Sequence, residues 1–166
     1  IGKSSNTDDF YAEENLLIQG LQGGSFAEVF PRGGVLDPLI HTSRGAAFGD
    51  VNGDGGIDIV VVNRDSPVYV LMNTNPDRGG FVKLKLIDRN GAPALNATVR
   101  FLLGTHQIRR EVRTSGGYCS SHDPTLNVGL GNEPRISNVE VTWSNGTKQH
   151  VDDILEGETL IIHQKK

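Results

Sequence analysis

The stretch GDVNGDGGID (residues 49–58) carries more oxygen-bearing side chains than a simple turn requires. Counting from Asp50 as position 1, Asn52 stands at position 3, Asp54 at position 5 and Asp58 at position 9. Side chains at positions 1, 3 and 5 of a tight loop point inward, and a glycine at position 6 permits the sharp bend. Calcium collects about six to eight oxygen ligands from loops of this kind. The spacing therefore predicts a calcium site.

The loop is not an EF-hand, because position 12 is Val61 rather than glutamate and its flanks read as strands rather than helices. Asp58 is therefore expected to act as the closing carboxylate. The alternative is a solvated hairpin in which Asn52-Gly53 and Asp54-Gly55 are only good turn formers. That alternative explains the glycines but not three carboxylates at positions 1, 5 and 9. The predicted calcium ligands are Asp50, Asn52, Asp54, the Gly56 carbonyl and Asp58.

No other group of residues indicates chemistry as clearly. The run CSSHDP (119–124) places Cys, Ser, His and Asp side by side, but catalytic partners must converge in space and sequence neighbours usually diverge. The five histidines show no spacing typical of metal ligands. We therefore expect no catalytic residues and no bound organic cofactor. Cys119 is expected to be a packed, inert thiol, and Trp143 a core residue.

The composition narrows the class of protein. The chain has 166 residues, a net charge of −4 and 22% charged residues, without a large basic cluster, so nucleic-acid binding has little support. No apolar run approaches the roughly 18 residues that span a bilayer. A single cysteine excludes an intrachain disulfide. These features fit a globular chain of one domain or two small ones.

The elements that must position the acidic loop are predicted to be strands. The run IDIVVVN (57–63) is too apolar for a strand with one wet face, so it should be central in its sheet. Residues 7–14 are predicted to form the only helical turn. The other strands expected in this half are 15–19, 25–30, 45–48 and 67–73.

Beyond residue 78 the pattern changes to clean alternation. In FVKLKLID (81–88), Val82, Leu84 and Leu86 fall on one face, while Lys83 and Lys85 fall on the other. Asn145-Gly146 predicts a two-residue hairpin turn. The remaining predicted strands are 98–104, 108–114, 125–131, 136–143, 148–154 and 159–164. We predict an all-β chain with two domains, 1–78 and 79–166, the second an antiparallel β-sandwich or barrel-like domain.

A faint repeat relates residues 15–29 to residues 69–84, each an apolar strand, a Gly-rich turn and an aromatic-led strand. Scarcely more than one period is present, so the first domain is predicted to be a partial, propeller-type blade segment. Its apolar strands need neighbours. An open sheet edge predicts self-association or an edge covered by a partner.

Two stretches also resemble known families. Residues 44–73 look like the FG-GAP/VCBS repeat of integrin-type β-propellers, which bind calcium in such a loop. Residues 80–154 resemble the ASPIC/UnbV domain, with SGGY (115–118), DPTLNVGLG (123–131) and VEVTWSNG (139–146) as landmarks. The resemblance implies a secreted, cell-surface or periplasmic module without established catalytic chemistry. Residue by residue, it carries a ligand role only onto the five positions of the acidic loop.

Two classes of function remain. The first is a calcium-binding, non-catalytic interaction module that presents loops to a protein or glycan, as the C-terminal part of a longer repeat protein. The second is a metal-dependent hydrolase or a component of a biosynthetic enzyme. Coordination discriminates between them, because a structural site is saturated by protein oxygens whereas a catalytic site keeps an open position. No positioned general base accompanies residues 50–58 in the sequence, which favours the first class.

Overall fold

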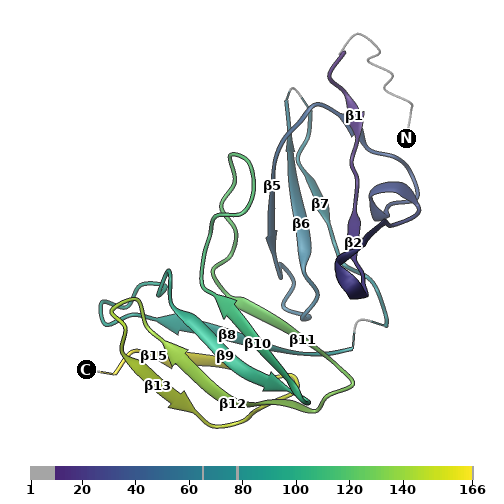
Figure 1. Ribbon diagram of the computed structural model, residues 1–166. Coiled ribbons are helices and arrows are strands. Elements are labelled where there is room, and N and C mark those ends of the chain that lie inside the picture. The colour runs from purple at the N-terminus through teal and green to yellow at the C-terminus, as the bar shows by residue number, and fades with distance from the viewer. Residues whose placement is uncertain (1–9, 65, 78, 166) are drawn as a thin grey trace. The chain divides into compact units, whose positions relative to one another are not determined.

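The computed structural model describes residues 10–64, 66–77 and 79–165, and strands make up nearly all of its regular structure (Figure 1). Strands account for 47% of the chain, and the described part contains no α-helix. Two single 3-10 turns, η1 (Gln22–Gly24) and η2 (Arg32–Gly34), interrupt the strands. None of the described sheets closes into a barrel. The all-β prediction is therefore confirmed.

Contacts divide the chain into two compact units. The first is drawn from residues up to Gly45 and from Val61–Tyr69, and the second from Ala46–Val60 and from Val70 onward. The acidic loop therefore belongs to the same compact unit as the strands that follow residue 80.

The N-terminal strands form two short ladders. β1 (Glu13–Glu14) pairs with β4 (Ile40–His41), and β2 (Ile18–Gly20) pairs with β3 (Phe26–Glu28). The helical turn predicted over 7–14 is wrong at Glu13–Glu14, and residues 7–9 lie outside the described residues. Long-range pairing overrides the local helix preference, because Glu13 and Glu14 form a ladder with His41 and Ile40 of β4.

A three-stranded sheet flanks the acidic loop. Its order is β5 (Ser43–Gly49), β6 (Asp58–Asn63) and β7 (Tyr69–Leu71). The prediction that residues 57–63 form a central strand is confirmed. Val61 is buried, whereas its neighbour Val62, on the other face of the strand, is 48% exposed in the chain as described.

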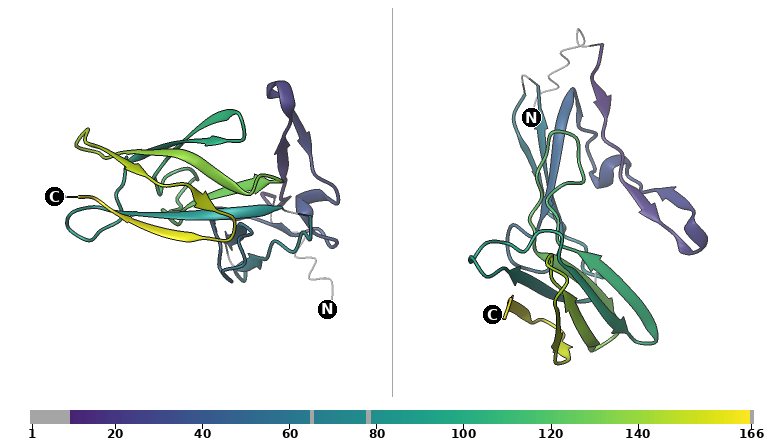
Figure 2. Two further views of the ribbon diagram at one scale, coloured as in Figure 1. Left: turned by 90° about the horizontal axis from the view of Figure 1, so that it is seen from below. Right: turned by 60° about the vertical axis from the view of Figure 1, so that its left-hand side comes forward.

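The C-terminal half is a sandwich of two sheets. One sheet has the order β10-β9-β12-β13, with β14 also paired to β12, and the other has the order β11-β8-β15. The left view of Figure 2 shows the two sheets as facing layers. The strands are β8 (Gly80–Ile87), β9 (Thr98–Leu103), β10 (His106–Glu111), β11 (Leu126–Gly131), β12 (Arg135–Thr142), β13 (Lys148–Val151), β14 (Ile154–Leu155) and β15 (Thr159–His163).

Every pairing in this sandwich is antiparallel except one. β15 runs parallel to β8, with Leu160 opposite Leu84. The predicted antiparallel sandwich is therefore correct for the remaining pairs, and the exception joins the first strand of the sandwich to its last.

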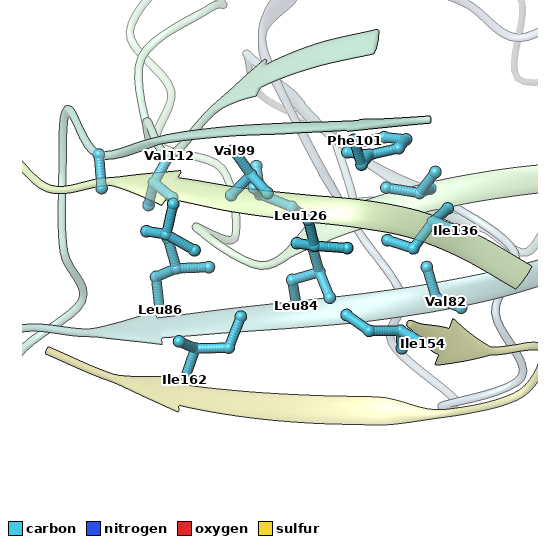
Figure 3. Close-up of a cluster of buried hydrophobic side chains, with 14 of the residues drawn as sticks. Val82, Leu84, Leu86, Val99, Phe101, Val112, Leu126, Ile136, Ile154 and Ile162 are labelled. Atoms are coloured by element: carbon cyan, nitrogen blue, oxygen red, sulfur yellow. The ribbon is translucent and has the colours of Figure 1, made fainter. Parts of the chain in front are cut away.

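The core of the sandwich follows from strand alternation (Figure 3). Val82, Leu84 and Leu86 point inward from β8 and are at most 2% exposed. Trp143, at the end of β12, is 3% exposed, so its predicted core position is confirmed. From the same sheet as β8, Leu126, Val128 and Ile162 join this core. The other core residues include Val99, Phe101, Val112, Ile136, Val139, Val141 and Ile154. Burial of this continuous apolar surface is the main stabilising term of the sandwich.

The turn between β12 and β13 differs from the prediction by one residue. The Trp143 amide donates to the Thr147 carbonyl at 2.9 Å, which leaves three residues in the loop. Only Gly146 adopts a positive φ, of 83°. Asn145 instead accepts hydrogen bonds from the Thr147 amide and hydroxyl, and this stabilises the three-residue form.

Apolar side chains are distributed very unevenly between the two halves. Among the described residues, every buried hydrophobic side chain except Val61 lies after residue 81. By contrast, all the large exposed apolar side chains except Leu95, Tyr118, Leu155 and Ile161 lie before residue 73. The N-terminal strands thus leave apolar surface uncovered in the chain as described.

Candidate functional site

The acidic loop joins the end of β5 to the start of β6 and lies against the outer face of β8. Gly55 adopts a φ of 88°, which side chains rarely tolerate. A Cβ at this position would overlap the ring of Phe81 on β8, so the glycine also permits close approach. Gly55 thus serves both the bend that the sequence pattern predicts and the packing of the loop.

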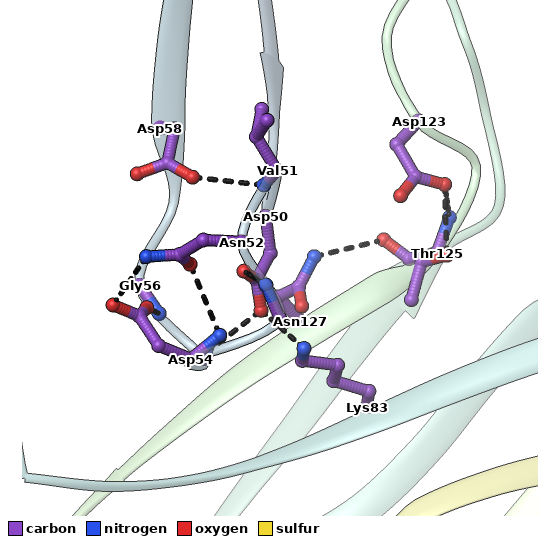
Figure 4. A network of polar contacts seen from close by, with 12 residues as sticks. Asp50, Val51, Asn52, Asp54, Gly56, Asp58, Lys83, Asp123, Thr125 and Asn127 are labelled. Atoms are coloured by element: carbon purple, nitrogen blue, oxygen red, sulfur yellow. Dashed lines mark hydrogen bonds and ion pairs between the residues drawn. The ribbon is translucent and has the colours of Figure 1, made fainter. Parts of the chain in front are cut away.

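Asp50 organises the first half of the loop. Its carboxylate accepts hydrogen bonds from the amides of Gly53 and Gly55, each at 2.7 Å, and forms an ion pair with the Lys83 ammonium (Figure 4). Burial acts to raise the pKa of Asp50, but the hydrogen bonds from Lys83, Gly55 and Gly53 outweigh it and hold the pKa below its ordinary value. Asp50 is therefore an ionised carboxylate at neutral pH.

Asn52, Asp54 and Gly56 are linked within one turn. The Asn52 side-chain amide donates to Asp54 Oδ2 at 2.8 Å, and the Asp54 main-chain amide donates back to Asn52 Oδ1 at 3.1 Å. The Gly56 amide donates to Asp54 Oδ1 at 2.8 Å. Three of the predicted ligand residues, Asn52, Asp54 and Gly56, thus lie in the same closed loop as Asp50.

Asp58, the predicted closing ligand, fixes the base of the loop. It is fully buried. Its Oδ2 accepts from the Val51 amide and its Oδ1 from the Asn73 amide, both at 2.8 Å. Each carboxylate oxygen retains a further lone pair. Asp58, at the start of β6, therefore connects the beginning of the acidic loop at Val51 to Asn73, in the segment after β7.

Lys83 is the residue that sequence reasoning missed. Alternation placed it with Lys85 on the face opposite Leu84, yet Lys83 is only 9% exposed because the acidic loop covers it. Its ammonium reaches Asp50 and lies 5.3 Å from the centroid of the Phe81 ring. No local signal could have revealed this contact, since the partners lie far apart in the sequence.

Asn127 carries a buried side-chain oxygen on the strand next to β8. It lies directly opposite Lys83 on the neighbouring strand β11. Its side-chain nitrogen donates to the Thr125 carbonyl at 3.4 Å. Its Oδ1 atom is shielded from solvent and has no hydrogen-bond partner within the described structure. A buried acceptor without a partner is uncommon in native proteins.

The oxygen atoms of the acidic loop are of the chemical types that bind a hard cation. Carboxylate, carboxamide and main-chain carbonyl oxygens are the ligands that calcium prefers. In the conformation described, however, no three His, Cys, Asp or Glu side chains converge as a ready metal-binding group among the residues with defined positions. The loop holds the predicted ligands in one place, while its carboxylates are engaged by amides and by Lys83.

The segment CSSHDP has structural roles. His122 Nδ1 accepts from the Phe48 amide at 3.1 Å, and Asp123 Oδ1 accepts from the amide and hydroxyl of Thr125. The expectation of a packed Cys119 is wrong, because its thiol is exposed. Cys119 has a φ of 47°, so it lies in a tight turn that directs it outward rather than in a strand.

Comparison with known proteins identifies the C-terminal part of the chain. Residues 88–166 match the protein family described as ASPIC and UnbV, and they form an ASPIC/UnbV domain. The chain is also similar to Cartilage acidic protein 1 of Xenopus tropicalis, with 38% identity over 80 residues. That match covers 45% of this chain but only 12% of the relative. The chain therefore spans a small part of the length of this relative.

Within residues 10–64, 66–77 and 79–165, no helix is long and apolar enough to cross a membrane.

Proposed function

We propose that this chain is a calcium-binding, non-catalytic interaction module of a larger extracellular or cell-surface protein. The observation that carries this proposal is the contrast between its two halves. The ASPIC/UnbV sandwich has a complete apolar core, whereas the strands before residue 73 leave most of their large apolar side chains exposed. Such surface is costly in water unless another part of a protein covers it.

The N-terminal strands fit the role of a blade segment. Their repeated pattern of apolar strands and Gly-rich turns resembles an FG-GAP/VCBS repeat, and repeats of that type bury their faces against neighbours. We infer that these neighbours are further repeats or a second copy of the chain. The sandwich then presents its loops to a protein or glycan ligand.

Calcium is the proposed ligand of the acidic loop. The main-chain hydrogen bonds of Asp50 and Asp58 hold the loop closed, and the side chains of Asn52 and Asp54 and the Gly56 carbonyl supply further oxygens of the right type. A bound cation would relieve the mutual repulsion of the three carboxylates. The proposed role is structural, because the chain's own groups near the loop are committed to hydrogen bonds rather than placed for proton transfer.

Thermal unfolding tests the calcium proposal. Extracellular calcium modules bind with dissociation constants of about 10⁻⁴ to 10⁻³ M. At about 10 mM calcium and a constant near 10⁻³ M, linkage adds about 1.4 kcal/mol to the free energy of unfolding. For a chain of this size the melting temperature should rise by roughly 3 to 6 °C relative to a chelator. Differential scanning calorimetry measures the rise, and titration calorimetry measures the binding.

An Asp54→Ala variant should lose the calcium-dependent rise. Asp152→Ala removes an exposed carboxylate outside the loop and should keep the rise, which controls for net charge. Equal melting temperatures with calcium and with chelator, together with no heat of binding, would leave the loop as a metal-free hairpin.

A further inference from the structure

A positively charged side chain of β8 already contacts the acidic loop. The Lys83 ammonium contacts the Asp50 carboxylate, and the side chains of the two residues are only 11% and 3% exposed. An ammonium and a carboxylate removed from water to this extent persist only when they are paired. Lys83 comes from β8, so the pair also joins the loop to the sandwich (Figure 4).

Lys83 pairs with Asp50, the first of the residues that the sequence pattern assigns to a metal. Asp50 is position 1 of the calcium pattern, and in the structure its carboxylate is shared by two main-chain amides and the ammonium. The carboxylate therefore has its charge compensated without any ion from solution. Asn127, opposite Lys83 on β11, has a buried Oδ1 atom without a hydrogen-bond partner among the described residues.

We infer that Lys83 is the built-in cation of the acidic loop, and that it competes with calcium for Asp50 and so sets the calcium affinity of the loop. This inference rests on the proposed function for its calcium part only. It assigns to Lys83 two measurable effects: the loop is ordered when calcium is absent, and calcium binds more weakly than the oxygen ligands alone would allow.

The electrostatic reason is direct. A calcium ion and an ammonium that share one carboxylate lie about 5 Å apart, and their repulsion even at the dielectric constant of water corresponds to about a tenfold loss in binding. If the ammonium instead moves away, its ion pair with Asp50 is lost. Either route lowers the affinity for calcium. Because Lys83 lowers the affinity, calcium fills the loop only where its concentration is high, as outside cells.

The test compares the intact chain with a Lys83→Met variant, which keeps the aliphatic stem and removes the charge. Titration calorimetry with calcium chloride should give a dissociation constant at least about tenfold lower for the variant. In chelator, the amides of Gly53 and Gly55 should exchange their hydrogens at least about tenfold faster than in the wild type, because Asp50 has lost its counter-ion. Lys85→Met, two residues further along the same strand and exposed, should change neither quantity.

Each result decides a different point. Equal calcium affinity for the wild type and Lys83→Met would overturn the inference while leaving the calcium function intact. Binding by Lys83→Met alone would support the inference and overturn the proposed calcium function of the unaltered chain. If neither protein binds calcium, the proposed calcium function fails, and unchanged amide exchange in Lys83→Met would then also overturn the role as built-in cation. If Lys83→Met fails to fold, Lys83→Gln keeps a hydrogen-bond donor for Asp50 and should show the same higher calcium affinity.

Discussion

An Ile162→Ala variant is expected to lose about 2 to 5 kcal/mol of the free energy of unfolding, the usual cost of truncating a buried isoleucine. Ile162 lies on β15, is 4% exposed and packs in the core against the strands of the facing sheet. The loss is a large share of the free energy of unfolding of a typical domain, which is about 5 to 15 kcal/mol. Chemical denaturation monitored by Trp143 fluorescence measures it.

The neighbouring residue supplies the matched control. Ile161 lies on the same strand and is 54% exposed, so Ile161→Ala removes the same atoms without opening a cavity. Its cost should stay below about 1 kcal/mol, the range of β-propensity differences. Similar losses for the two variants would mean that β15 does not present Ile162 to the core as described.

An Asp58→Asn variant is expected to lose about 2 to 4 kcal/mol even in the presence of a chelator. Both carboxylate oxygens accept main-chain hydrogen bonds, from Val51 and from Asn73, in a fully buried position. Asparagine offers one acceptor oxygen, and its amide group would face a main-chain N–H. One buried donor is therefore left without a partner, which costs far more than a lost surface hydrogen bond. Urea denaturation in chelator provides the measurement.

Asp152→Asn makes the same chemical change at an exposed site and should be nearly neutral. Suppose that Asp58→Asn is as stable as the wild type in chelator and loses only its response to calcium. Asp58 would then act as a metal ligand, and its hydrogen bonds to Val51 and Asn73 would not be what stabilises the loop.

The strands of the sandwich could be predicted because their signals are local. The alternation of Val82, Leu84 and Leu86 places one face of β8 in the core wherever its neighbours lie. The hairpin of β9 and β10 depends on a short turn within the segment. The parallel partner of β8 could not be predicted in this way, because β15 is separated from it by the whole domain and no local pattern specifies its direction.

In the candidate site, too, the features set by local sequence could be predicted and those set by distant contacts could not. The bend at Gly55 and the inward side chains of Asp50, Asn52 and Asp54 follow from spacing within one loop, and the structure places them together. The burial of Lys83 depends on the packing of that loop over β8, a contact between distant segments. Alternation describes which face of a strand a residue occupies, but not what covers that face.

The parallel β8–β15 pair also constrains how the sandwich can fold. β8 is the first strand of the sandwich and β15 is the last. During synthesis, the ladder between β8 and β15 can therefore form only after nearly the whole domain has been made. Until then β8 has an unpaired edge, and its inward leucines have an incomplete cover. Contacts so distant in sequence slow folding, because a long loop must close before they contribute. The nascent sandwich is therefore most vulnerable to misassociation just before β15 is added.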